Sequence, residues 1–158
     1  MYPELPDLIL EIKNRSLAVK LDTNGTNPTM LKMLLEKRLL DYVAMDIKAP
    51  WAKYKQICGV DYLLEKIKES TDLLLMGQVP YEFRTTFIPE LSREEILEIA
   101  QIIKGARLYI LQQYRLPELP ADEKKVLRLQ KSPHSVNYIR KTAQQVAQWV
   151  QACETRGI

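Results

Sequence analysis

The 158-residue sequence is poor in the residues that build metal centres and nucleophilic sites, with two cysteines and one histidine. Cys58 and Cys153 lie far apart, and their spacing matches no metal-binding or redox motif. We therefore expect two unpaired thiols in a reducing compartment. His134 follows Ser132 and Pro133, which we interpret as a helix cap and a first helical position. This pattern argues against a zinc site and against a Ser-His-Asp triad.

Long apolar runs and a strong charge imbalance are also missing. The longest purely apolar stretches span only a few residues, which is too short for a membrane span. The beginning of the sequence lacks the basic and apolar regions of a signal peptide. A net charge of +3 gives no reason to expect a nucleic-acid or acidic-membrane partner. The remaining composition predicts one ordinary globular domain over residues 1–158, located in the cytoplasm.

Apolar residues recur at alternating helical and strand spacings along the sequence. The predicted order is a helix at 5–15, a strand at 17–21, a helix opening at Asn27 and Pro28, a strand at 42–47, a mostly helical stretch at 51–80, a strand at 81–88, a helix between Ser92 and Gly105, a strand at 107–111 and a helix at about 133–150. Such alternation is typical of a parallel sheet joined by right-handed crossovers. The sequence thus predicts an α/β fold with about four parallel strands and helices on the outer, convex face.

Three of the predicted strands carry charged residues, although strands of a parallel sheet are normally apolar on both faces. The residues that share a face within a strand are Lys20 with Asp22, Asp46 with Lys48, and Glu82 with Arg84 and Thr86. We expect these faces to align, so that the charges converge near the carboxyl ends of the strands, where such sheets bind ligands. The alternative is structural pairing, in which Asp22 caps a turn and Arg84 neutralises Asp46.

The segment Asp22-Thr23-Asn24-Gly25 follows the first predicted strand. Considered alone, it is better explained as an Asx-type turn than as a binding site, because Asp, Asn and Gly are the usual turn formers.

Three segments together resemble radical S-adenosylmethionine (SAM) enzymes, and in particular the activating proteins of anaerobic ribonucleoside-triphosphate reductases. The segments are Leu17-Ala18-Val19-Lys20-Leu21-Asp22-Thr23-Asn24-Gly25-Thr26-Asn27-Pro28, Leu40-Asp41-Tyr42-Val43-Ala44-Met45-Asp46-Ile47-Lys48-Ala49-Pro50 and Tyr81-Glu82-Phe83-Arg84-Thr85-Thr86. They keep the family's order and spacing over most of the chain. The resemblance implies a partial (βα) barrel of the radical SAM type.

The resemblance also implies that two acidic residues lie beside the methionyl carboxylate of the cofactor. These are Asp22 of the D-T-N-G turn and Asp46 of the D-x-K strand. In the family, the two carboxylates hold a monovalent cation together with backbone carbonyls, which by position would be those of Thr23 and Ala44. A cation there is physically sensible, since several carboxylates in one pocket repel each other.

Two further residues match cofactor-binding positions of the resembling family, and a third lies in the turn that carries Asp22. Lys48 corresponds to a lysine that contacts the cofactor and neutralises its carboxylate, Arg84 to a polar strand position that lines the pocket, and Asn24 belongs to the same turn as Asp22. We include all three, with Asp22, Thr23 and Asp46, in the expected cofactor-binding set, and we expect no catalytic side chain.

The sequence departs from the family in lacking the C-x-x-x-C-x-x-C motif, whose thiolates bind a 4Fe–4S cluster, and the G-G-E-P segment. The chain therefore resembles the C-terminal two-thirds of a radical SAM enzyme. We expect the complete family protein to use SAM and a 4Fe–4S cluster, and these 158 residues to carry no cluster and no activity alone.

Two functional interpretations remain open. In the first, the chain belongs to an activase that forms a glycyl radical on an anaerobic ribonucleoside-triphosphate reductase through a 5′-deoxyadenosyl radical. In the second, it is a non-catalytic half-barrel that binds or assembles with another chain. We also expect the exposed edge of the first strand to favour homo-oligomers. A generic phosphate-binding domain has little support, because no Gly-rich phosphate loop is present.

Overall fold

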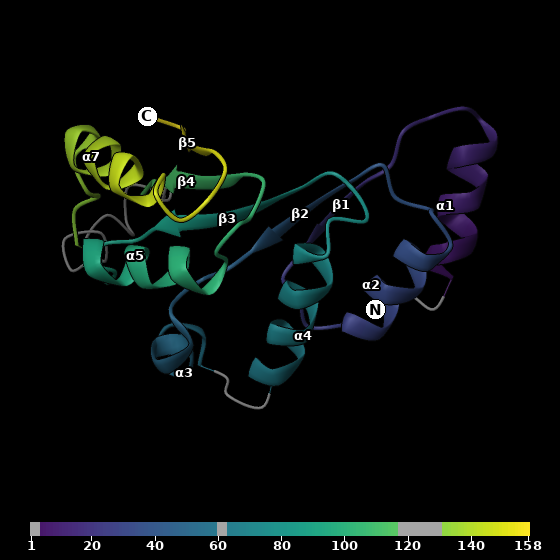
Figure 1. The fold of residues 1–158 in the computed structure, drawn as a ribbon, viewed down its shortest axis with the longest axis horizontal. Helices are drawn as coiled ribbons and strands as arrows, with labels where there is room; N and C mark the ends of the chain where they lie inside the picture. The colour runs from purple at the N-terminus through teal and green to yellow at the C-terminus, as the bar shows by residue number, and fades with distance from the viewer. Residues whose placement is uncertain (1–3, 60–62, 117–130) are drawn as a thin grey trace, which may run out of the picture.

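The computed structural model describes residues 4–59, 63–116 and 131–158, and these residues form a parallel sheet flanked by helices (Figure 1). The strands are β1 (Lys20–Thr23), β2 (Tyr42–Asp46), β3 (Tyr81–Phe87), β4 (Tyr109–Gln113) and β5 (Cys153–Arg156). The helices are α1 (Leu5–Asn14), α2 (Pro28–Glu36), the short 3₁₀ helix η1 (Trp51–Lys53), α3 (Tyr54–Cys58), α4 (Leu64–Leu75), α5 (Arg93–Ile102) and α7 (Val136–Val146).

All neighbouring strands are parallel, and the sheet order β1-β2-β3-β4-β5 follows the sequence order. The predicted α/β class with a parallel sheet is confirmed, but the expected number of strands is wrong, because β5 is an additional strand. Its four residues are too few to show a clear alternation of apolar and polar side chains. Two of them, Glu154 and Arg156, are charged and exposed, so the segment resembles a polar tail after the last helix.

Several predicted boundaries also need correction. The first strand spans Lys20–Thr23 rather than 17–21, and the fourth spans Tyr109–Gln113 rather than 107–111. The last helix spans Val136–Val146 rather than 133–150. Its N-cap is Ser135, whose hydroxyl accepts a hydrogen bond from the Tyr138 N–H, so the predicted Ser132 cap is wrong. Ser135 prevails because its backbone is extended and its oxygen reaches the third helical N–H.

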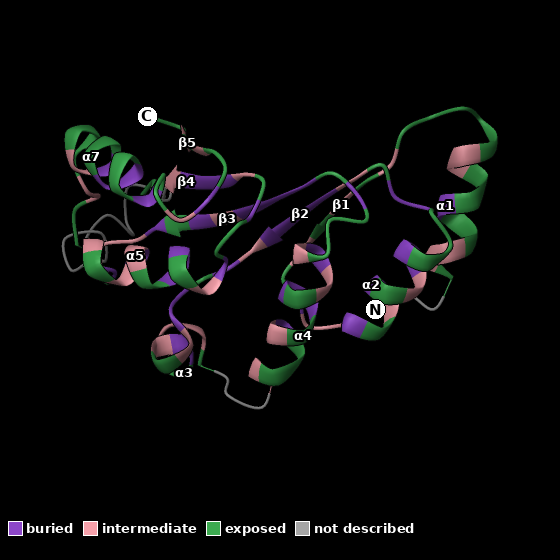
Figure 2. Ribbon diagram, in the orientation of Figure 1, coloured by how far each residue is buried: buried purple, intermediate pink, exposed green. Residues whose placement is uncertain are grey.

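The hydrophobic core lies between the helices and one face of the sheet. Buried side chains of β2, β3 and β4 such as Met45, Phe83 and Tyr109 form one cluster with Leu34 of α2 and Ile99 of α5. In Figure 2 the central strands β2, β3 and β4 are largely buried, while each helix has exposed and buried sides. One-sided helix burial of this kind is what an amphipathic helix contributes to an α/β fold.

The other face of the sheet is polar. Because strand side chains alternate, the residues on this face are Lys20 and Asp22 of β1, Tyr42, Ala44 and Asp46 of β2, Glu82, Arg84 and Thr86 of β3, Ile110 and Gln112 of β4, and Glu154 and Arg156 of β5. We call it the polar face. Most of its members are charged or hydrogen-bonding, so the sheet is apolar toward the helices and polar on its opposite side.

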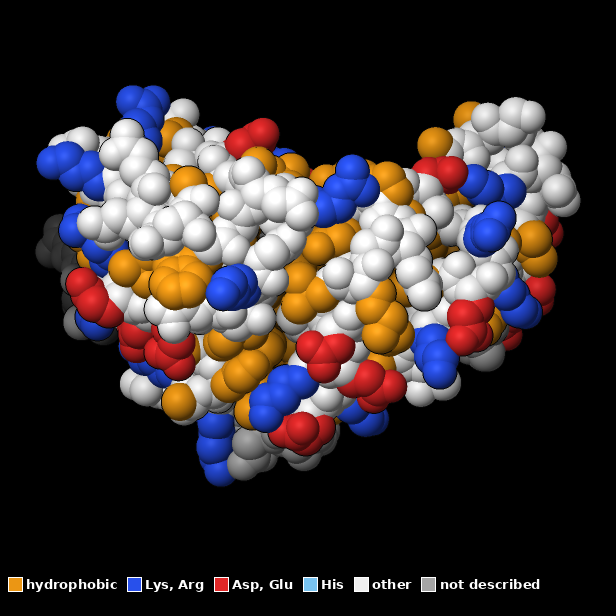
Figure 3. Space-filling model, in the orientation of Figure 1, with side chains coloured by type: hydrophobic (Ala, Val, Ile, Leu, Met, Phe, Trp, Pro, Cys, Tyr) orange, Lys and Arg blue, Asp and Glu red, His pale blue; other side chains and the backbone are white. Residues whose placement is uncertain are grey.

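The surface carries charges of both signs without a large block of one sign on the face shown in Figure 3, in keeping with a net charge of +3. None of the helices within the described ranges has the length and apolar character needed to cross a membrane.

Candidate functional site

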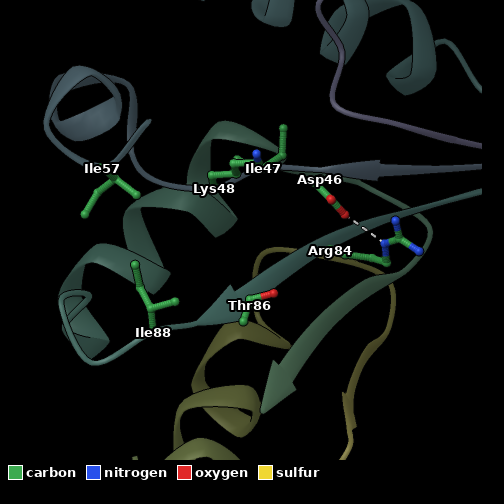
Figure 4. Close-up of a pocket in the computed structure, with 7 residues that line it drawn as sticks. All are labelled: Asp46, Ile47, Lys48, Ile57, Arg84, Thr86 and Ile88. Atoms are coloured by element: carbon green, nitrogen blue, oxygen red, sulfur yellow. Dashed lines mark hydrogen bonds and ion pairs between the residues drawn. The ribbon is translucent and has the colours of Figure 1, made fainter. Parts of the chain in front are cut away.

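Arg84 of β3 lies between the carboxylates of β1 and β2 on the polar face. Its Nε donates a hydrogen bond to Asp46 Oδ1 at 2.9 Å, and its Nη1 donates to Asp22 Oδ1 at 3.2 Å (Figure 4 shows the first contact). The register places Asp46 opposite Arg84, and Asp22 opposite Ala44 one strand away. The predicted convergence of these three residues is therefore present. The Arg84–Asp46 ion pair, which the alternative of purely structural pairing also predicts, is present as well.

The turn after β1 is stabilised by its own side chains, but not by Asp22. The Asn24 carboxamide oxygen accepts hydrogen bonds from the N–H of Thr26 at 3.1 Å and from its hydroxyl at 2.8 Å. The Thr23 hydroxyl accepts from the Gly25 N–H at 3.0 Å. An Asx-type turn is thus confirmed, with Asn24 as the turn residue. Asp22 remains available on the polar face, where its side chain is 60% exposed.

Gly25 fixes the position of this turn against the core. Its φ of +76° lies in the left-handed region, and a Cβ added there would overlap the Met45 side chain. Its carbonyl accepts a hydrogen bond of 2.8 Å from the buried Ser70 hydroxyl of α4. The turn that follows Asp22 is therefore held from both β2 and α4.

Two cavities adjoin the Asp46–Arg84 pair. One, of about 240 Å³, is lined by Asp46, Ile47, Lys48, Ile57, Arg84, Thr86 and Ile88 (Figure 4). The other, of about 430 Å³, is lined by Leu5, Leu21, Asp22, Thr23, Asn24, Asn27, Met30, Leu31, Asp46 and Arg84. The smaller cavity lies where β2 and β3 end and the larger one where β1 and β2 end, and all six predicted cofactor-binding residues line one cavity or the other. Lys48 lies beyond the end of β2 and is exposed.

Comparison with known proteins identifies the family. A sequence model of the Radical SAM superfamily matches residues 1–103, which is well over half of the chain. The chain belongs to the radical SAM superfamily.

Two relatives add detail to this assignment. This radical SAM chain is 37% identical over 134 residues to a Methanocaldococcus jannaschii protein described as a "Putative glycyl-radical enzyme activating enzyme", an alignment that covers 79% of this chain and 56% of the relative. The chain therefore spans little more than half of that relative's length. In structure it is similar to a domain of a pyruvate-formate lyase-activating enzyme from Bacteroides vulgatus, with a TM-score of 0.73, 14% identity, and coverage of 97% and 89% of the two chains. That likeness confirms the fold.

The donor set of the two cavities fits the SAM cofactor of this superfamily. SAM carries an amino acid with an ammonium and a carboxylate, a sulfonium cation, and a flat aromatic adenine ring. The site offers two carboxylates to a positive group, and Arg84 and Lys48 to a negative one. Ile47, Ile57 and Ile88 supply apolar walls. Cavities of a few hundred Å³ with few polar groups are typical of small-molecule sites.

The residues present do not fit an iron–sulfur cluster. The sequence has two cysteines, whereas the superfamily's cluster motif uses three. Cys58 lies at the end of α3 and Cys153 at the start of β5, and both are free thiols. Burial raises the pKa of both, in the case of Cys153 to about 12, which disfavours the thiolate form that binds iron. Across the described part of the chain, no group of three His, Cys, Asp or Glu residues could hold a metal ion.

His134 has a structural environment. Its Nε2 lies 2.9 Å from the Leu91 carbonyl, and its ring packs against Phe87 and Tyr138 with centroid separations of 4.4 and 5.0 Å. These contacts join the segment before α7 to the end of β3, and His134 itself lines neither of the two cavities.

Glu82, which shares its strand face with Arg84 but was not among the expected cofactor-binding residues, is a buried acid beside this site. The Glu82 side chain is 4% exposed and accepts two hydrogen bonds of 3.2 Å from Arg156 of β5, with Lys20 at 3.7 Å and the Tyr42 hydroxyl at 3.2 Å. Burial opposes its ionisation, but Arg156, Lys20 and Tyr42 outweigh that effect and hold the pKa of Glu82 below its usual value. Its shared face with Arg84 was a usable signal, but Arg156 lay outside any predicted strand.

Proposed function

We propose that this chain is the SAM-binding part of an activating protein for a glycyl-radical enzyme. The observation that carries the proposal is the arrangement of Arg84, Asp22 and Asp46 between two cavities at the carboxyl ends of the strands. Membership of the radical SAM superfamily and the description of the M. jannaschii relative support the same conclusion. SAM, together with an iron–sulfur cluster, supplies the hydrogen-abstracting chemistry of this superfamily.

The chain's own residues would bind and orient the cofactor. Lys48 and Arg84 offer positive charge to its carboxylate, and Asp22 and Asp46 offer acceptors to its ammonium. The isoleucines around the smaller cavity exclude water from its apolar part. Thr23 and Asn24 shape the turn at the larger cavity. A monovalent cation held by Asp22, Asp46 and the carbonyls of Thr23 and Ala44 would lie beside the Arg84 guanidinium, which already contacts one oxygen of each carboxylate.

The finer part of the proposal concerns the partner. The D-T-N-G, D-x-K and third-strand segments favour an anaerobic ribonucleoside-triphosphate reductase as the glycyl-radical enzyme, acting in a reducing cytoplasm. Residues 1–158 do not provide three cysteines, so we propose that residues outside them bind the cluster. Binding of the chain to this reductase, but not to pyruvate formate-lyase, in sedimentation experiments would support this choice of partner. Equal binding to both would contradict it.

Calorimetric titration with SAM tests the cofactor site. Asp46→Asn and Arg84→Met should each weaken binding about tenfold, because each removes a charge-assisted contact. Asp72→Asn changes an exposed carboxylate of α4 outside both cavities and should leave the affinity unchanged. If the wild-type chain does not bind SAM, or if all three variants bind equally, the cofactor site is wrong and the non-catalytic half-barrel becomes the better interpretation.

A further inference from the structure

A pair of buried hydroxyl groups lies on the helix side of the sheet, directly behind the proposed cofactor site. Thr85 of β3 alternates with Arg84 and Thr86, so its side chain lies on the opposite face, between Phe83 and Phe87. Thr85 is 1% exposed and Tyr109 of β4 is fully buried. A buried hydroxyl is unfavourable unless it is hydrogen-bonded, so the contacts of these two residues matter.

The two hydroxyls form a chain of two hydrogen bonds, in which each group has only one possible donor or acceptor role. The Tyr109 hydroxyl donates to Thr85 Oγ1 at 2.8 Å, and the Thr85 hydroxyl donates to the Ile47 carbonyl at 2.6 Å. The carbonyl can only accept, which forces the Thr85 proton toward Ile47 and leaves its oxygen to accept from Tyr109. We call this chain of contacts the hydroxyl relay.

The relay ends on the segment that presents Asp46 and Lys48. β2 ends at Asp46, and the Ile47 N–H still donates to the Arg84 carbonyl at 2.9 Å. The Ile47 carbonyl lies one position further on, and Thr85 satisfies it. Both polar groups of Ile47 are thus bonded to β3, which fixes the peptide units on either side of this residue.

This anchoring has a consequence for the two flanking side chains. Ile47 is fully buried and lines the smaller cavity together with Asp46 and Lys48 on either side. If the Ile47 carbonyl lost its partner, the buried acceptor would be unsatisfied and the segment would relax toward another donor. Lys48 follows the end of the strand ladder, so its position depends on this carbonyl and on a backbone contact with the buried Tyr54 hydroxyl.

We propose that Thr85 and Tyr109 are positioning residues that hold the Asp46–Lys48 segment in place for the cofactor, a role that rests on the proposed function. Neither side chain lines either of the two cavities. They act through the Ile47 carbonyl. Thr85 makes the direct contact, and Tyr109 orients the Thr85 hydroxyl.

Four variants separate positioning from general stability. Thr85→Val removes the hydroxyl at nearly constant volume, Thr85→Ser retains it, and Tyr109→Phe removes only the outer donor. Thr142→Val is the matched control, because Thr142 is also fully buried and donates to a backbone carbonyl, that of Tyr138 in α7 at 2.9 Å. Urea unfolding establishes whether Thr85→Val and Thr142→Val lose comparable stability.

The first readout needs no ligand. Amide hydrogen exchange at Ile47 and Lys48 should be about tenfold faster in Thr85→Val than in Thr142→Val at matched global stability, with Thr85→Ser close to wild type and Tyr109→Phe between them. Equal exchange in Thr85→Val and Thr142→Val would overturn the proposal, whether or not the chain binds SAM.

The second readout is the affinity for SAM. Thr85→Val should bind about tenfold more weakly than wild type, and both Thr85→Ser and Thr142→Val should bind within about twofold of it. Equal affinity in Thr85→Val and Thr142→Val would also overturn the positioning role. If the wild-type chain does not bind SAM at all, the proposed function and the relay's role toward the cofactor fail together. Faster exchange in Thr85→Val would then leave only a structural anchor.

Discussion

At the scale of single residues, Gly25 connects the turn after β1 to the core. We expect Gly25→Ala to destabilise the fold by about 2–4 kcal/mol, the sum of a left-handed backbone for a residue with a Cβ and an overlap with Met45. The free energy of unfolding in urea measures this change.

Gly77 provides a matched control for that substitution. Its φ is +71°, but a Cβ added there would have no atom within 4 Å. Gly77→Ala should therefore show only the backbone cost of about 1–2 kcal/mol. If Gly25→Ala and Gly77→Ala lowered the free energy of unfolding equally, contact with Met45 would not constrain the turn.

At the scale of elements, one ion pair joins the last strand to the middle of the sheet. Arg156 of β5 makes two hydrogen bonds of 3.2 Å to Glu82 of β3, across the polar face. We expect Arg156→Met to lower the free energy of unfolding by about 1–2 kcal/mol. The loss is smaller than for a fully buried pair, because the Arg156 side chain is 49% exposed. As a control, Arg140→Met at an exposed position of α7 should change the free energy of unfolding little.

The same pair should make stability depend on pH in the acid range. The folded pKa of Glu82 lies below its ordinary value of 4.5, so its contribution is fully present above pH 4.5 and is lost as the pH falls through the folded pKa. The difference in unfolding free energy between wild type and Arg156→Met should therefore shrink under acid conditions. A difference that stayed constant with pH would show that Glu82 is not the group whose charge Arg156 stabilises.

At the scale of the whole molecule, β1 is an edge strand of the sheet. α1 packs on the core through Ile9, and Lys13 pairs with Asp41 at 2.6 Å, but Leu8 and Leu17 remain more than half exposed. Because an edge strand beside exposed apolar residues favours pairing with another chain, we expect self-association. Sedimentation across a concentration series should show a mass that rises above 18.4 kDa.

Substitutions that introduce a charge test whether the chains associate through the β1 edge. Leu17→Lys should shift the association to higher concentration, whereas Met76→Lys, at a still more exposed residue after α4, should leave it unchanged. A monomer at every concentration would contradict the prediction and would mean that α1 protects the edge sufficiently.

Much of the candidate site could be predicted from residue alternation. Asp22, Asp46 and Arg84 share a strand face by parity, and parallel strands place equivalent ends together, so their convergence follows from local sequence. Glu82 has the same parity, but its importance depends on Arg156, which lies on a strand too short and too polar to recognise. Thr85 and Tyr109 lie 24 positions apart, and their contact depends on how β3 and β4 pair.

The sequence by itself determined the alternation of strands and helices, the parallel sheet and the face on which the charges lie, because side-chain periodicity is a local property of the backbone. Only the tertiary structure decided that a fifth strand pairs with β4 at the edge of the sheet, that Arg84 bridges two carboxylates, and that the hydroxyl relay holds the Ile47 carbonyl. These features join residues distant in the chain. Their partners are chosen by strand register and packing, which no local pattern encodes.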